Sequence, residues 1–114
     1  MSGWSKLLSV GKVDELASLL GCDIDGLKNY INSSSTSISQ PKGNDLWITS
    51  LDGTWGTWDG KVISIYYHSY NRHSATTVGK LGFKRSVAEA GHWAVSIQTR
   101  ALGGNKAYYN NDFK

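Results

Sequence analysis

Aromatic and basic side chains are the residues of this chain best suited to bind a ligand. Tyr and Trp rings stack on sugars, and Arg and Lys bind phosphate oxygens. Neighbouring residues of a strand point to opposite faces, so one tyrosine of Tyr66–Tyr67 and one of Tyr108–Tyr109 should face outward. The sequence therefore predicts a contact set for a ligand made of sugars and phosphates: Trp55, Tyr66, Tyr67, Tyr70, Arg72, His73, Lys84 and Arg85.

The residue types that carry catalysis or bind metals do not converge in the sequence. His68 and His73 are five residues apart, and no spacing supplies the third ligand that a zinc site needs. The four carboxylates after residue 50 are scattered, whereas acid–base catalysis needs two that converge. The single cysteine, Cys22, excludes an intramolecular disulfide. We therefore expect no enzymatic activity, no cofactor and no metal.

Basic and aromatic residues are concentrated in the second half of the 114-residue chain. Residues 1–50 hold four basic and five acidic side chains, whereas residues 51–114 hold eight basic and four acidic ones. The second half also holds 10 of the 13 aromatic residues. We therefore expect partner binding there, to an anionic wall or lipid surface. The formal net charge of +3 is too small to indicate a nucleic-acid partner.

The first half has the apolar spacing of short helices. One helix is predicted over 13–20, where Gly21 provides a C-terminal stop, and a second from Asp23 or Asp25 to Ile31. A Ser-rich linker is expected over 32–40, within an N-terminal segment of residues 1–50. No apolar run approaches the ~18 residues of a membrane span, and no signal-peptide pattern is visible, so an exported form would be a mature or excised piece.

The second half has the pattern of an antiparallel β-sandwich over residues 51–114, which makes the predicted fold class α+β. Strands are predicted over 62–68, 74–78, 92–99 and 107–110, with glycines between them at strand-length intervals. Trp93, Val95 and Ile97 alternate on one face, so we assign Trp93 to the core. Some of the other aromatic residues could equally belong to the core. A fragment of residues 52–114 should be rich in β-structure.

Three interpretations of the helical segment remain open. Residues 8–50 resemble the peptidoglycan-binding LysM module, because a helix that ends in glycine is followed by an Asp-rich helix, a linker and a short apolar strand. A helix-turn-helix regulator is disfavoured, because Asp23 and Asp25 would face DNA phosphates. The third possibility is a helical hairpin that packs its apolar face on the sheet.

Residues 52–113 resemble the lactococcin 972 family of bacteriocins. Four segments in the family's order and spacing carry the resemblance: Gly53–Trp55, Tyr66–Val78, Ala90–Ala94 and Asn105–Asn110. The resemblance implies a secreted β-sandwich that kills related bacteria, acts on the cell-wall precursor lipid II and blocks septum synthesis without forming pores. It also implies a cognate immunity protein. The alternative function is a non-toxic cell-wall-binding or adhesion module.

Overall fold

The computed structural model describes residues 3–33, 36–41, 45–51 and 60–111. Its described part begins with three helices: α1 (Gly3–Val10), α2 (Val13–Leu20) and α3 (Ile24–Ile31). Helix α2 ends at Gly21, whose φ of 71° is the left-handed conformation that glycine adopts without strain. Helix α3 begins after Asp23, whose Oδ1 accepts a hydrogen bond from the backbone N–H of Gly26 at 2.7 Å. Both helices predicted from the sequence are confirmed, and α1 is an additional one.

Seven strands follow in the described residues and form two antiparallel sheets. They are β1 (Ser37–Ser39), β2 (Leu46–Ser50), β3 (Lys61–Tyr67), β4 (His73–Gly79), β5 (Gly82–Ala88), β6 (Trp93–Thr99) and β7 (Lys106–Asn110). The first sheet has the order β1-β2-β3-β6 and the second has the order β5-β4-β7. The four predicted strands agree with β3, β4, β6 and β7 to within one residue. The α+β class with a β-sandwich is therefore confirmed.

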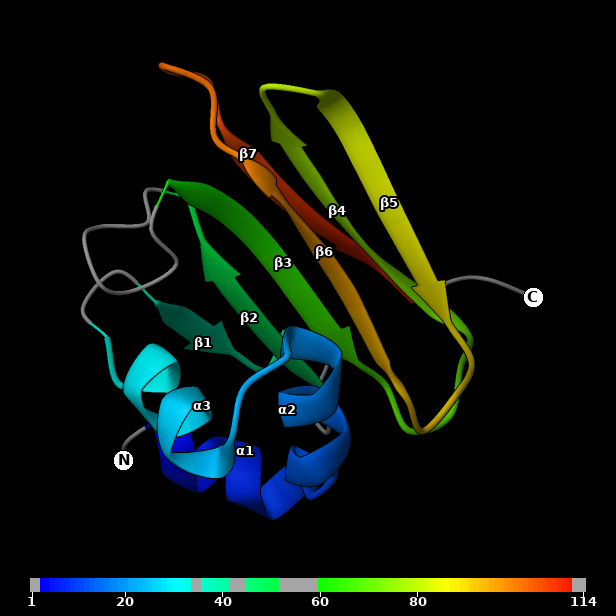
Figure 1. Ribbon diagram of the computed structural model, residues 1–114. Coiled ribbons are helices and arrows are strands. Elements are labelled where there is room, and N and C mark those ends of the chain that lie inside the picture. Colours follow the sequence, from blue (N-terminus) through cyan, green and yellow to red (C-terminus); the bar gives the residue numbers. More distant parts are fainter. Residues whose placement is uncertain (1–2, 34–35, 42–44, 52–59, 112–114) are drawn as a thin grey trace.

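The molecule has three layers, with the helices on one face of the first sheet and the second sheet on its other face (Figure 1). Leu7, Leu16 and Leu27 of the helices are fully buried in one cluster with Leu46, Ile63 and other residues of the first sheet. A smaller cluster, centred on Tyr66, Ala75 and Ala94, lies between the sheets. Strand β3 is consequently buried along both faces.

Polar side chains join the two sheets. Ser96 Oγ donates to the backbone oxygen of Lys84 at 2.7 Å, and Gln98 Nε2 donates to the backbone oxygen of Gly82 at 2.8 Å. Ser64 Oγ donates to the backbone oxygen of Tyr108 at 2.9 Å. The sheets approach so closely that a Cβ on Gly79 would lie 2.8 Å from the backbone oxygen of Thr99. Strand β6 thus fixes β5 in position, although the two strands belong to different sheets.

The first fifty residues contribute strands as well as helices. Strand β1 lies inside the segment expected to be a linker and pairs with β2, which in turn pairs with β3 from Leu46↔Tyr67 to Ser50↔Ile63. The expected boundary near residue 50 therefore falls between two paired strands. The helices pack on the sheet, and whether they also bind peptidoglycan stays a prediction.

Candidate ligand-binding surface

Tyr66 is buried between the sheets, with no exposed surface. Its hydroxyl donates to Asp45 Oδ2 and accepts a hydrogen bond from Asn111 Nδ2 at 3.1 Å. Burial, together with the hydrogen bond to Asp45, raises the pKa of Tyr66 far above its usual value, so the phenol stays neutral. Tyr66 was expected in the contact set, but in this structure it ties together the segments before β2 and after β7.

Tyr67 points to the opposite face and is also buried, with 7% of its surface exposed. Its ring packs on that of Trp93, with the centroids 5.1 Å apart, on the helical side of the sheet. The assignment of Trp93 to the core is confirmed, because only 4% of it is exposed. The expectation that one tyrosine of this pair faces outward fails, because helices cover one face of β3 and a second sheet covers the other.

His73, another member of the predicted contact set, is fully buried at the start of β4. Its Nδ1 lies 2.9 Å from the backbone oxygen of Asn71, and its Nε2 lies 2.7 Å from that of His92. The ring also packs edge-on against Tyr66, with the centroids 5.6 Å apart. His73 therefore joins the β3–β4 turn to the segment before β6 and presents no surface to a ligand.

The remaining predicted contact residues lie in three places. Tyr70, 78% exposed, and Arg72, which forms an ion pair with Glu89 at 3.1 Å, lie in the turn between β3 and β4. Lys84 and Arg85 lie on β5. Lys84 Nζ donates to the backbone oxygen of Ile97 at 2.8 Å. Trp55 lies outside the described residues.

The outer face of the second sheet gathers side chains suited to a sugar–phosphate ligand. Its register places Thr76 of β4 opposite Arg85 of β5 and also opposite Tyr108 of β7. These three residues form one row across the sheet. In the adjacent row Val78 lies opposite Phe83 on β5 and Lys106 on β7. Small β4 residues thus lie between larger side chains on the two flanking strands.

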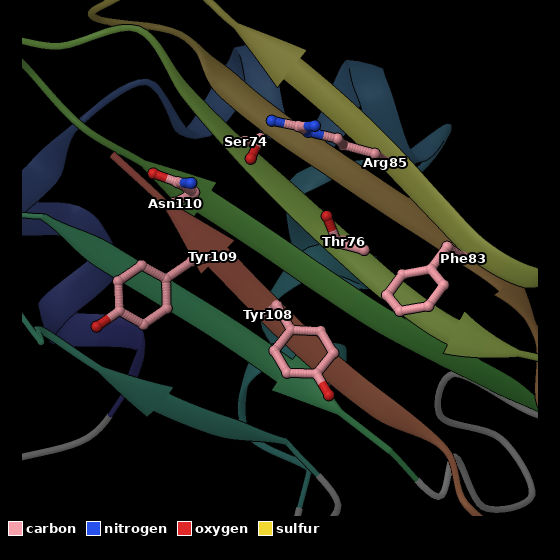
Figure 2. A pocket seen from close by; sticks show the side chains of 7 residues that line it. All are labelled: Ser74, Thr76, Phe83, Arg85, Tyr108, Tyr109 and Asn110. Carbon is pink, nitrogen blue, oxygen red and sulfur yellow. The ribbon is translucent and has the colours of Figure 1, made fainter. Parts of the chain in front are cut away.

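An open groove of about 470 Å³ follows this surface (Figure 2). It is lined by Ser74, Thr76, Phe83, Arg85, Tyr108, Tyr109 and Asn110. Phe83 is 77% exposed and Tyr108 is 44% exposed, so both offer ring surface to a ligand. Tyr109 instead packs inward on Trp47 and Tyr66. For the pair Tyr108–Tyr109 the expectation of one outward tyrosine is confirmed. We call this surface the outer groove.

Among the described residues, the balance of charge differs between the helices and the strands after residue 60. The helices and their flanking residues carry three cations and four acids, whereas the residues after 60 carry seven cations and one acid, Glu89. These seven cations are Lys61, Arg72, Lys80, Lys84, Arg85, Arg100 and Lys106, and four of them lie on the second sheet or in its β4–β5 hairpin. An anionic ligand is therefore attracted to this part of the chain more than to the helices.

Of the residues that line the outer groove, the predicted contact set contains only Arg85. Tyr108 was expected only as one of a pair with a single outward tyrosine, and Phe83 was not predicted. Phe83 and Val87 are apolar, but the charged Arg85 shares their face of β5, so apolar and polar residues do not alternate along this strand. The pairing of β4 with both β5 and β7, which brings Arg85 and Tyr108 to opposite sides of Thr76, is not recorded in any local pattern either.

The described part of the chain contains no group of three or more His, Cys, Asp or Glu side chains placed to hold a metal ion. None of its helices has the length and apolar character needed to cross a membrane.

Comparison with known families identifies the class of protein. The sequence profile of the lactococcin 972 bacteriocins matches residues 52–109, which span half of the chain and run from the segment before β3 to Tyr109 in β7. The chain therefore belongs to this family of antibacterial proteins, as its sequence motifs indicated. Neither the curated proteins nor the solved structures contain a match to the chain.

Proposed function

We propose that this protein is a secreted bacteriocin that binds lipid II at the outer groove and blocks septum peptidoglycan synthesis without forming pores. It acts by holding the precursor rather than by catalysis, and the producing cell requires an immunity protein. Family membership supports the antibacterial role. The groove supports the choice of ligand, because it combines exposed aromatic rings with a cation, and lipid II joins sugars to a lipid through a pyrophosphate.

The observation that carries the proposal is the row Arg85–Thr76–Tyr108 across the outer groove. The Tyr108 ring offers an apolar face for a sugar, and the Arg85 guanidinium offers paired N–H groups for phosphate oxygens. Thr76 between them is small and half-buried, which leaves room for the ligand. Phe83 adds a second exposed ring in the neighbouring row.

The same elements support the proposal that no pore is formed. A pore former needs an apolar span of ~20 residues or an amphipathic segment that inserts. The strands of the second sheet are five to seven residues long, and their side chains are largely polar. Binding should also weaken as salt rises, because the phosphate contacts are ionic.

The test uses purified protein and dye-loaded liposomes with and without lipid II. The proposal predicts that the protein sediments with the lipid II liposomes, releases no dye from either kind, and blocks septum formation when added to sensitive Gram-positive cells. Rapid leakage from liposomes without lipid II would contradict it. Binding to isolated peptidoglycan, with no binding to lipid II at any salt concentration, would favour the wall-binding alternative.

A further inference from the structure

One end of the sandwich presents two exposed leucines on adjacent loops. Leu81 lies at the tip of the β4–β5 hairpin and is 73% exposed, and Leu102 lies in the β6–β7 loop and is fully exposed. Residues of both loops, including Lys80, Arg100 and Leu102, line a common surface hollow. Figure 1 shows both loops at the upper edge of the molecule, away from the three helices. We call this end the leucine tip.

The leucine tip is held in place by hydrogen bonds to the sandwich. The backbone N–H of Leu81 donates to Gln98 Oε1 at 2.9 Å, and that of Lys80 donates to the backbone oxygen of Thr99 at 3.0 Å. In the second loop Asn105 Oδ1 accepts from the backbone N–H of Ala101 at 2.7 Å. The backbones of both loops are therefore ordered by hydrogen bonds, which lowers the conformational cost of binding.

The two described segments that form the leucine tip carry charges of one sign. Residues 79–84 and 97–106 contain four cations and no acidic residue. These cations are Lys80, Lys84, Arg100 and Lys106. Apolar tips surrounded by cations match a layer of anionic headgroups that lies over hydrocarbon. An acidic protein partner would need an apolar pocket for each leucine as well as complementary charges, whereas an anionic membrane supplies both along its whole surface.

We propose that the leucine tip docks on an anionic phospholipid membrane, with Leu81 and Leu102 in the interface and Lys80 and Lys106 on the headgroups. This goes beyond lipid II binding, because it requires no lipid II. It also has a consequence for the outer groove, since the row of Phe83 and Lys106 is the one nearest the tip. Docking would hold that groove beside the membrane surface, where the headgroup of a lipid-linked precursor lies.

The experiment is cosedimentation with vesicles of phosphatidylglycerol and phosphatidylcholine that contain no lipid II. We expect binding to these vesicles but not to vesicles of phosphatidylcholine alone. The double variant L81Q/L102Q should bind about tenfold more weakly, because two apolar side chains leave the interface. The double variant K80Q/K106Q should lose about fivefold for each cation. Circular dichroism checks that each variant keeps the fold.

The matched control is Leu19→Gln, since Leu19 is 54% exposed on α2, on the helical side of the molecule. It should bind like the wild type. Equal vesicle binding by L81Q/L102Q and the control would overturn the proposal. So would binding only to soluble anionic wall polymers, unaffected by the leucine changes. A separate assay with detergent-solubilised lipid II distinguishes the two proposals, because L81Q/L102Q should retain that binding even where vesicle binding is lost.

Discussion

The carboxylate of Glu15 in α2 accepts a hydrogen bond from the backbone N–H of Trp93, the first residue of β6, at 3.0 Å. Its other oxygen lies 3.0 Å from His92 Nδ1. The indole Nε1 of Trp93 in turn donates to the backbone oxygen of Lys12 at 3.0 Å. Residues 77 to 81 positions apart in sequence are thereby joined, and the helical layer is fixed on the bacteriocin-family region.

Stability should depend on the charge of Glu15. Burial raises its pKa, but the hydrogen bonds from His92 and Trp93 outweigh burial, and the pKa is lowered from 4.5. A lowered folded-state pKa stabilises the protein above the unfolded pKa, and this stabilisation is lost as the pH falls through the folded value. Glu15→Gln should therefore reduce the free energy of unfolding by about 1 kcal/mol at neutral pH and by progressively less below pH 4.5.

Urea unfolding across this pH range measures the effect. Asp14→Asn is the matched control, because Asp14 is an exposed first-turn acid of the same helix. A stability difference between Glu15→Gln and the wild type that stays constant from neutral to acidic pH would contradict the role of the Glu15 carboxylate.

Gly79 should be intolerant of a side chain. A Cβ there would lie 2.8 Å from the Thr99 backbone oxygen and 2.9 Å from Val62 Cγ1, at the close approach of the two sheets. Gly79→Ala should therefore destabilise the protein by about 1–3 kcal/mol. The control is Gly103→Ala, whose Cβ would meet nothing within 4 Å. Thermal unfolding of both variants is the measurement, and equal stability of the two would refute the close packing.

The family-matching region should not fold well alone. A fragment of residues 52–114 lacks β2, so β3 loses its partner along five paired positions. It also exposes Ile63, Ile65 and Trp93, which are buried in the cluster shared with the helices. Far-UV circular dichroism should show much less β-structure than the full chain, contrary to what sequence alone suggested. A fragment with native-like strands and cooperative unfolding would show that β2 and the helices are dispensable.

Local signals account for the elements that the sequence predicted correctly. Apolar spacing and Gly21 define α2, the Asp23 cap defines the start of α3, and β-branched and aromatic runs define β3 and β6. Strand β5 was missed because it is an exposed edge strand in which apolar and polar residues do not alternate. Pairing between strands depends on contacts distant in sequence, which no local pattern records.

The same limit explains the outcome for the contact residues. Composition correctly indicated that cations and exposed aromatic rings gather in the second half. It did not indicate that β3 would lie in the middle layer, between the helices and the second sheet. Tyr66 and Tyr67 are buried because both faces of β3 are covered. His73 is buried for a related reason, because the backbone oxygens of Asn71 and His92 surround its ring. The groove row of Arg85 and Tyr108 depends on the strand order β5-β4-β7.

Titration of solubilised lipid II against matched variants tests most directly whether lipid II binds at the outer groove. Tyr108→Ala and Arg85→Gln remove a ring and a cation from the groove, whereas Tyr70→Ala and Arg72→Gln remove the same groups from the β3–β4 turn. We predict that the groove variants each weaken lipid II binding by about tenfold or more, and that the turn variants bind within about twofold of wild type. The reverse result, with binding lost in the turn variants and kept in the groove variants, would contradict the account.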